Sequence, residues 1–312
     1  MDPLQRFVSG PRAQGVFSLH VSMRPPWCVD VDDRAPLTVV AATTGSTWLV
    51  HSTEPPALLE PGTVALLAHG RRYFVADEPK RAPTVRIGPG QVCEPMPGSG
   101  IREADARGLL TWGNADDGPD QLLIGTYEAR SMVGDHVTAA LPDLAVLAPG
   151  AVDPALLDLL RRELTEPGAG HGMVVDRLLD LIVCMAVRAA ADSGSGWLSG
   201  TTDPVVAGVL DLIHGAPAEP WTLDRLADAV HVSRATMAAR FRTHVGCPPG
   251  DYLIRWRIAL AADALTETDL PLTAIAERVG YATPFALSTA FTRVQGTSPA
   301  SYRADQRLSD RV

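Results

Sequence analysis

The chain has 312 residues, of which 46% are hydrophobic and 20% charged, and its formal net charge is −9. This length predicts about two domains, and the composition is typical of a globular protein. No run of roughly 18 apolar residues is free of charge, so no membrane span is predicted. The first residues lack a basic region followed by an apolar core, so no signal peptide is predicted and a cytoplasmic location is expected.

The distribution of cysteines and charges excludes further classes. The four cysteines, at positions 28, 93, 184 and 247, form no Cys-x-x-Cys pair, which argues against a disulfide framework or a zinc site. Residues 1–202 hold 24 acidic and 16 basic side chains, whereas residues 203–312 hold 12 and 11. Because a DNA-binding protein needs a basic face and not a basic total, the net charge does not exclude nucleic acid as a partner.

Short apolar runs between Gly and Pro signals dominate residues 1–135 and predict a small β-sandwich or β-barrel. The predicted strands are residues 36–40, 47–51, 58–59, 64–67, 72–75 and 121–128. Residues 81–118 are rich in Pro and Gly, and we expect a long irregular excursion there.

Helical spacing begins after Asp153, an N-cap that is followed by Pro154 at the first helical position. A second helix is predicted at about residues 173–191, with one apolar face formed by Val174, Leu178, Leu181, Ile182 and Met185. Residues 151–196 are therefore expected to form a helical hairpin, which either covers the barrel or forms a dimer interface.

Residues 222–303 contain one pattern twice. The first copy reads TLDRLADAVHVSRATMAARFRTHVGCPPGDY and the second reads LTAIAERVGYATPFALSTAFTRVQGTSPASY. Each copy predicts a capped helix, a tight turn at His231 or Gly280, and a second helix, which is the helix-turn-helix plan. A single helix over residues 251–265 would be about 22 Å long, and it would set the two second helices ~34 Å apart, one turn of DNA.

These two blocks resemble the double helix-turn-helix domain of the AraC/XylS family of bacterial transcriptional regulators, here residues 203–307. Less specifically, GSTWLV followed by PGTVALLAHG resembles the cupin-like sensor barrel of one subgroup, here residues 1–150. The resemblance implies an α+β chain with a β-barrel and helical hairpin, then an all-α DNA-binding domain. It implies a regulator of transcription that binds double-stranded DNA, is controlled by a small organic effector, forms a homodimer, and contacts RNA polymerase if it is an activator.

The candidate DNA contacts lie in or next to the two second helices. They are Arg234, Ala235, Thr236, Ala238, Ala239, Arg240 and Arg242 in the first, and Thr283, Pro284, Phe285, Ser288, Thr289 and Arg293 in the second. Most of these side chains are small or apolar, whereas the family commonly has side chains there, such as arginine, that bind bases more strongly. Two interpretations stay open: Ala, Thr and Phe contact thymine methyl groups with DNA shape contributing, or specificity rests on Arg234 and Arg240.

Neighbouring positions have their own expectations. Met237, Phe241, Leu287 and Phe291 are expected in the helical cores. Arg255 and Arg257, on the helix between the units, are equally suited to contacts within the protein and to phosphate contacts.

For the barrel, the candidate effector-binding residues are Trp27, Trp48, His51 and Tyr73, each of which is also compatible with a plain core or surface position. No metal, other cofactor or catalytic residue is predicted, because the histidines lack the spacing of ligands. Two alternatives remain. Cys28 and Cys93 would carry a redox response, as in some relatives of the subgroup, or simply be buried hydrophobes. A cupin enzyme with a DNA-binding appendix lacks any recognisable nucleophile, so no enzymatic activity is expected.

Overall fold

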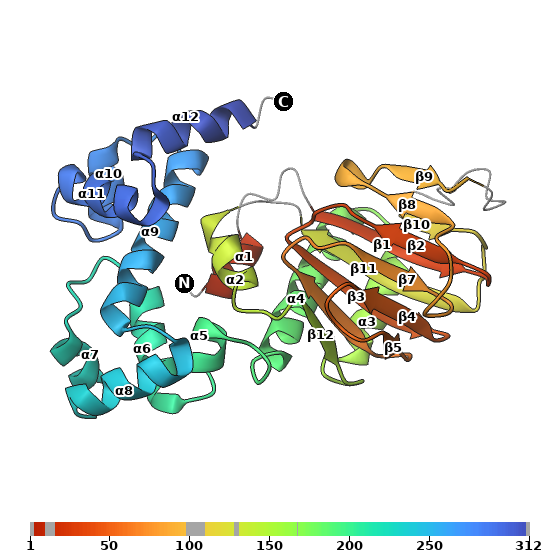
Figure 1. Ribbon diagram of the computed structural model, residues 1–312, viewed down its shortest axis with the longest axis horizontal. Coiled ribbons are helices and arrows are strands. Elements are labelled where there is room, and N and C mark those ends of the chain that lie inside the picture. Colours follow the sequence, from red (N-terminus) through yellow and green to blue (C-terminus); the bar gives the residue numbers. More distant parts are fainter. Residues whose placement is uncertain (1–2, 10–15, 98–109, 128–130, 167, 310–312) are drawn as a thin grey trace. The chain divides into compact units, whose positions relative to one another are not determined.

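The computed structural model describes residues 3–9, 16–97, 110–127, 131–166 and 168–309, and the chain divides into two compact units (Figure 1). The β unit comprises residues 12–129 and 141–193. The helical unit comprises residues 1–11, 130–140 and 194–312. The chain thus leaves the β unit for residues 130–140, returns to it, and leaves again at residue 194.

Two six-stranded sheets form the β unit. The strands are β1 (Val16–Met23), β2 (Cys28–Val31), β3 (Leu37–Thr44), β4 (Thr47–His51), β5 (Ala57–Leu59), β6 (Val64–Ala68), β7 (Tyr73–Ala76), β8 (Val85–Ile87), β9 (Cys93–Pro95), β10 (Thr111–Gly113), β11 (Asp120–Tyr127) and β12 (Leu144–Leu147). The strand orders are β10-β1-β11-β3-β6-β12 and β5-β4-β7-β2-β8-β9. Neighbouring strands are antiparallel except β1 with β10 and β2 with β8.

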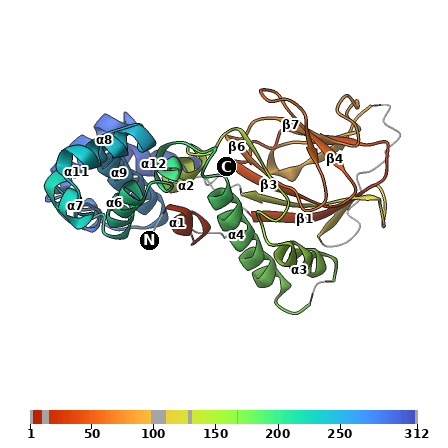
Figure 2. The same cartoon turned by 90° about the horizontal axis from the view of Figure 1, so that it is seen from below.

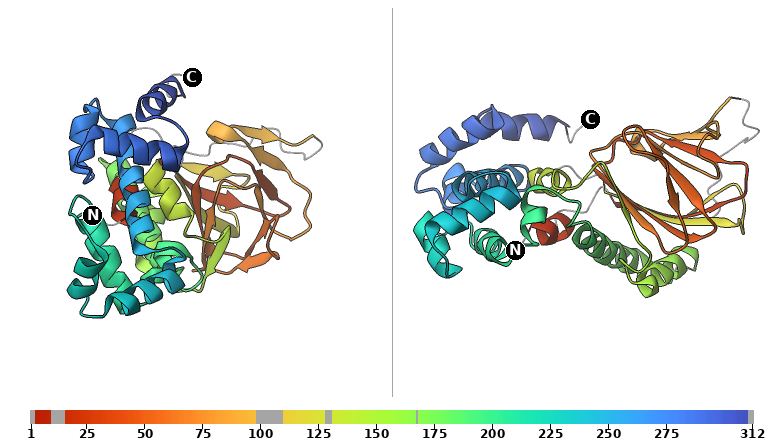
Figure 3. Two further views of the ribbon diagram at one scale, coloured as in Figure 1. Left: turned by 60° about the vertical axis from the view of Figure 1, so that its left-hand side comes forward. Right: turned by 60° about the horizontal axis from the view of Figure 1, so that its bottom comes forward.

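The core of the β unit lies between the two sheets, which face each other in Figure 3. The helices α3 (Pro154–Thr165) and α4 (His171–Ala189) pack on the outer face of the first sheet (Figure 2). Strand β3 is therefore buried at each of its first six positions, because both of its faces are covered. Close packing explains Gly125 of β11, since a methyl group there would collide with the Leu179 side chain of α4.

The structure confirms strands at all six predicted places, within a residue or a few at their ends. The prediction of a wholly irregular excursion over 81–118 is wrong, because β8, the 3₁₀ turn Pro89–Gln91, β9 and β10 fall within it; residues 98–109 lie outside the described residues. These strands have three residues each, and β8 and β10 also pair with strands far away in sequence, so local patterns do not show them.

The helical unit consists of short helices around one long one. They are α1 (Pro3–Ser9), α2 (Met132–Thr138), α5 (Gly196–Gly200), α6 (Pro204–Gly215), α7 (Leu223–Ala229), α8 (Arg234–Val245), α9 (Pro249–Glu267), α10 (Leu272–Arg278), α11 (Pro284–Gln295) and α12 (Pro299–Ser309). The sequence predicts N-caps at Thr222 and Ser233, and both are confirmed, since each side chain accepts a backbone N–H of its helix. Thr283, the counterpart of Ser233 in the repeat, caps α11 in the same way. Both turns have left-handed backbone, with φ of 57° at His231 and 85° at Gly280.

The helical hairpin forms as predicted, but the structure groups it with the barrel and not as a separate segment. Leu178 and Ile182 of α4 are buried, whereas Leu181, expected on the same face, is 51% exposed. The short helix α2 was not predicted, and it packs in the helical unit. None of the helices among the described residues has the length and apolar character needed to cross a membrane.

Candidate nucleic-acid interface and effector cavity

Each helix pair is held by a small apolar core of its own. In the first pair, Leu226 of α7 packs with Met237 and Phe241 of α8, and all three are buried. In the second, Ile275 of α10 and the buried Leu287 and Phe291 of α11 take the same places. The predicted core positions are confirmed. Because the inner faces of α8 and α11 are buried in these cores, their opposite faces are exposed to solvent.

Arg257 of α9 ties the two pairs together. Its Nε and Nη2 donate to the carbonyl oxygens of Pro217 and Glu219, both at 2.8 Å, in the loop before α7. Its guanidinium also lies 5.8 Å from the ring centroid of Tyr281, in the turn of the second pair. Burial lowers the pKa of Arg257, in keeping with a structural and not a phosphate-binding position.

The second turn also touches the loop before α7 directly. A methyl group on Gly280 would lie 2.7 Å from both Cα and the carbonyl oxygen of Ala218. Only glycine therefore satisfies both the left-handed backbone and the close approach at this turn. Together with Arg257, this contact fixes the orientation of α11 relative to α8 within the helical unit.

The outer face of α8 is small and flanked by arginines. Ala235 and Ala239 are exposed, Ala238 is half-buried, and Arg234 and Arg242 lie exposed at either end. Arg234 approaches the Asp224 carboxylate at 3.5 Å, whereas no described residue pairs with Arg242. The structure therefore brings five of the predicted contacts onto one accessible surface.

Thr236 and Thr283 have structural partners instead. The Thr236 hydroxyl and backbone N–H both bond to the Oγ of Ser233, at 2.8 and 3.1 Å. Thr283 Oγ1 accepts the N–H of Ala286 at 3.1 Å. Both predicted contacts thus serve the caps of their helices, which leaves less of each side chain for DNA.

Arg240 is bound within the protein. Its guanidinium forms an ion pair with Asp203, which also caps α6 by accepting the N–H of Val205 and Val206. Although burial would raise the pKa of Asp203, the hydrogen bonds from Arg240 and Val206 hold it below its usual value. The predicted phosphate or base contact by Arg240 would require breaking this pair, so the geometry favours a structural role.

The outer face of α11 begins with an exposed aromatic side chain. Phe285 is 82% exposed, the most exposed of the large hydrophobic side chains that the structure describes. Thr289 lies one turn further along, and its hydroxyl donates to the carbonyl oxygen of Phe285 at 3.0 Å. Pro284 and Ser288 are half-buried, and Arg293 is exposed toward the end of the helix. The two recognition surfaces are therefore chemically unlike.

Helix α2 is held by a carboxylate of α9. Asp263, only 4% exposed, accepts the N–H groups of Met132 and Val133 at 2.7 and 3.3 Å. Ser131 accepts the next N–H, from Gly134, at 2.8 Å. Burial raises the pKa of Asp263 to about 7, although the two hydrogen bonds act in the opposite direction.

A second polar contact holds the other end of α2. The Tyr252 hydroxyl lies 2.9 Å from Nε2 of His136 in α2 and 2.7 Å from Nε2 of His214 in α6. Burial lowers the pKa of His136 to about 4 and that of His214 to about 3, so both rings are neutral. Sequence reasoning missed this network; the only local sign was Asp263, an acidic residue inside the apolar run ALAADAL.

The β unit encloses a small cavity between its sheets, of about 30 Å³, which is room for about one water molecule. Its wall is mostly aliphatic and aromatic, and it includes Trp27, Tyr73 and Trp112. The polar groups are Thr126 and, at one end, Asp33 and Gln91, which are joined by a hydrogen bond of 3.0 Å.

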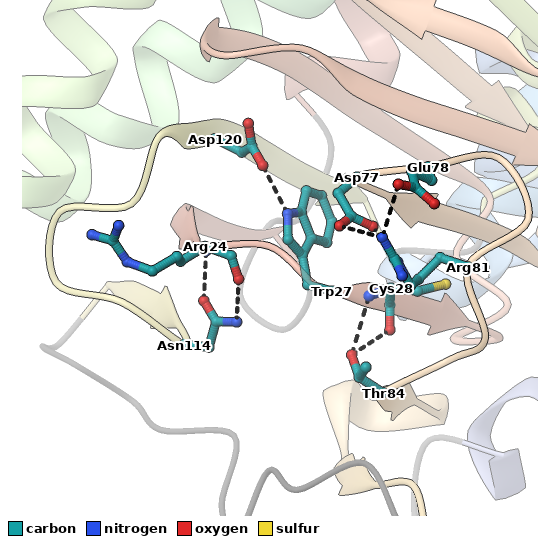
Figure 4. Close-up of polar contacts among 9 residues, drawn as sticks. All are labelled: Arg24, Trp27, Cys28, Asp77, Glu78, Arg81, Thr84, Asn114 and Asp120. Atoms are coloured by element: carbon teal, nitrogen blue, oxygen red, sulfur yellow. Dashed lines mark hydrogen bonds and ion pairs between the residues drawn. The ribbon is translucent and has the colours of Figure 1, made fainter.

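Of the four predicted effector residues, two line the cavity and two do not. Trp27 and Tyr73 line the cavity, and Trp27 Nε1 donates to Asp120 Oδ2 at 2.8 Å (Figure 4). Trp48 is half-buried on the opposite face of its strand from the core residue Leu49. His51 is buried at the end of β4, where its Nδ1 lies 3.0 Å from Thr53 Oγ1. Neither Trp48 nor His51 lines the cavity.

The two cysteines of the redox alternative are poorly placed to pair. From the strand registers, Cys28 and Cys93 lie two strands and about three residues apart, or ~14 Å, too far for a disulfide in this conformation. Burial and the carboxylates of Asp30 and Asp77 raise the pKa of Cys28 to about 11, which disfavours the reactive thiolate. Figure 4 shows Cys28 and Asp77. Among the described residues, no three His, Cys, Asp or Glu side chains gather as metal ligands would.

Two helix-turn-helix units tied by one helix define a DNA-binding protein. Residues 2–192 match a family model described as Cupin, and residues 226–305 match one described as Helix-turn-helix domain. The chain is 33% identical to a putative AraC-like transcription regulator of Streptomyces antibioticus, over 97% of this chain and 98% of that one. A second such regulator, of Streptomyces lividans, is 32% identical over 97% and 98%. The chain belongs to the family of AraC-like transcription regulators.

Among solved structures, the helical region is similar to the DNA-binding domain of AdpA, described as the global transcriptional factor, in complex with a target DNA. The two are 34% identical over 34% of this chain and 96% of that one, with a TM-score of 0.33.

Proposed function

We propose that this regulator binds its operator with α8 and α11 in successive major grooves, under the control of a small apolar effector in the β unit, and that it acts as a homodimer. Its role is regulatory and not catalytic, and contact with RNA polymerase is expected if it activates transcription. The observation that carries the proposal is the fixed pair of recognition helices, joined through Arg257 and Gly280.

The proposed DNA binding predicts a phosphate contact for Arg242, whose guanidinium has no partner among the described residues. If this side chain meets a phosphate, Arg242→Ala weakens binding about equally on all sequences and lowers the salt slope of the affinity by about 1. The control is Arg188→Ala on α4 of the β unit, which removes the same charge from another exposed helix.

Fluorescence anisotropy of the full chain with duplexes from its own upstream region would measure both variants over a range of salt. A salt slope that changes equally in both variants, or in neither, would show that Arg242 does not meet the backbone of DNA. Salt-independent or absent binding to every duplex would refute operator binding itself.

The effector-binding part rests on the cavity between the sheets. Its wall is apolar apart from Thr126 and the Asp33–Gln91 pair, so we propose a compact hydrophobic effector with a polar group that replaces this hydrogen bond. Because the cavity now has room for about one water molecule, binding must widen it, and that movement supplies the difference between free and bound states.

Benzene, indole and hexanol are suitable probes, since apolar cavities bind such molecules without specific contacts. At least one should raise the unfolding temperature of the full chain, and Ile124→Trp, which fills the cavity wall, should abolish the rise. Mass spectrometry of the purified protein should detect a co-purifying hydrophobic molecule. No shift with any probe, or an equal shift in Ile124→Trp, counts against this cavity as the effector site.

We propose that α2 carries the effect to the DNA-binding helices. The chain of β11, whose Leu122 and Ile124 line the cavity, continues into α2, and α2 is bound to α9 through Asp263 and Tyr252.

The homodimer is proposed from α4. This helix buries one face on the first sheet and leaves Met173 and Leu181 exposed, at 68% and 51%. Light scattering should show a dimer for the native chain and a monomer for Leu181→Asp. A native chain that stays monomeric at tens of micromolar would exclude this arrangement.

A further inference from the structure

Phe285 is an apolar side chain left in water at the start of a recognition helix. It directly follows Pro284, the first residue of α11, and it is 82% exposed, whereas Leu287 and Phe291 on the inner face of the same helix are fully buried. A buried aromatic ring gains free energy that an exposed one forgoes. Most of the apolar surface of Phe285 is therefore left in contact with solvent in the folded chain.

The groups beside Phe285 supply few hydrogen-bond donors for base edges. Pro284 has no N–H, and Thr289 uses its hydroxyl hydrogen on the carbonyl oxygen of Phe285 at 3.0 Å. Thr283 Oγ1 accepts the N–H of Ala286 in the cap, which orients this hydroxyl toward its own helix. The first two turns of α11 consequently offer mainly carbon to whatever they meet, with Arg293 as the charged group further along the helix.

In the major groove only one base presents an apolar group, the C5-methyl of thymine, and phenylalanine is a side chain that contacts it. Insertion of apolar wedges between base pairs is instead typical of the minor groove. Resting on the proposed placement of α11 in a major groove, we propose that Phe285 selects thymine by contact with its methyl group.

The first recognition helix gives the contrast that makes this inference specific. In the internal repeat, Ala235 of α8 takes the place of Phe285, and exposed arginines stand at both ends of that face. Arginine suits guanine or phosphate, and alanine allows close approach without a thymine preference of the same strength. The operator should therefore be asymmetric, with the thymine requirement confined to the half-site under α11.

The test begins with selection of duplexes from a randomised pool by the full chain. In the selected duplex, uracil then replaces each thymine in turn, which removes only the methyl group. One position under α11 should lose about fourfold in affinity, equivalent to ~0.8 kcal/mol for one methyl group. At that position, 5-methylcytosine paired with guanine should bind more tightly than cytosine.

Phe285→Ala should bind the thymine and uracil duplexes equally, and its folding should be intact because the side chain is exposed. Arg242→Ala is the matched control, since it should weaken both duplexes and keep their ratio. A native thymine-to-uracil ratio that survives in Phe285→Ala overturns the inference. So does a variant that keeps native DNA affinity but loses self-association, which would make Phe285 a protein contact. Failure to select any duplex would instead refute the proposed DNA binding.

Discussion

The buried carboxylate of Asp263 makes the pH dependence of unfolding a test of how α2 is held. Asp263→Asn keeps the size of the side chain and one acceptor oxygen for the two N–H groups of α2, but it removes the titration. Raised from 3.8 to about 7, the pKa of Asp263 means that the folded chain holds this proton more tightly than the unfolded chain. Its contribution to stability is fully present below pH 3.8 and is lost as pH rises through about 7.

His136 and His214 act in the opposite sense. Their pKa values are lowered from 6.5 to about 4 and about 3, so their contributions are present above pH 6.5 and are lost as pH falls. Each titration changes the free energy of unfolding by about 1.4 kcal/mol per pH unit. As pH falls from about 6.5 to 4.5, the two histidines lower the free energy of unfolding and Asp263 raises it. The native chain should therefore lose ~1.4 kcal/mol of unfolding free energy per pH unit, and Asp263→Asn, which lacks the opposing contribution, should lose ~2.8 kcal/mol per pH unit.

Urea unfolding followed by circular dichroism, repeated across this pH range, would measure the difference. The control is Asp211→Asn on α6, an exposed carboxyl group in the same unit, whose curve should run parallel to the native one. Over the two pH units, the gap between Asp263→Asn and the native chain should widen by about 3 kcal/mol. Parallel curves for all three proteins would mean that Asp263 is ionised throughout, and that burial does not dominate its pKa.

Four further variants separate structural from functional roles. Gly280→Ala should destabilise the chain by about 2 kcal/mol in urea unfolding, from left-handed strain and contact with the preceding loop, whereas His231→Gly should stabilise it by about 1 kcal/mol. Arg240→Ala should lower stability without changing the salt slope of DNA affinity; a reduced slope would restore Arg240 as a phosphate contact. Cys28→Ser with Cys93→Ser should respond to hydrogen peroxide as the native chain does, and a response lost only in the double variant would revive the redox alternative.

The features that could be predicted from the sequence are those fixed by residues close together in the chain. The caps at Thr222, Ser233 and Thr283 are read from one residue and the turn that follows it. The left-handed turns at His231 and Gly280 follow from the repeat and the tolerance of these residues for positive φ. These features needed no knowledge of distant contacts.

What could not be predicted depends on partners remote in sequence. The sequence makes Arg240 a candidate DNA contact, but the residue that binds its guanidinium, Asp203, lies 37 residues earlier in the chain. Helix α2 has seven residues, too few for an independent helix, and it receives two of its capping bonds from Asp263, about 130 residues away. The effector residues were only partly predicted for a similar reason: Trp48 lies on the face of β4 opposite the core residue Leu49, whereas Trp27 reaches the cavity from the position just before β2.

Family boundaries and physical boundaries differ in this regulator. The cupin match covers residues 2–192, yet α1 and α2, which fall within it, belong to the helical unit. Asp263 and Tyr252, which bond to α2, and His214, which bonds to Tyr252, all lie in the DNA-binding part of the chain. A fragment starting at residue 194 would retain these buried groups but lose the helix that satisfies and covers them, at a cost of about 1–3 kcal/mol for each unsatisfied polar group. A segment within the cupin match is therefore part of the same compact unit as α8 and α11.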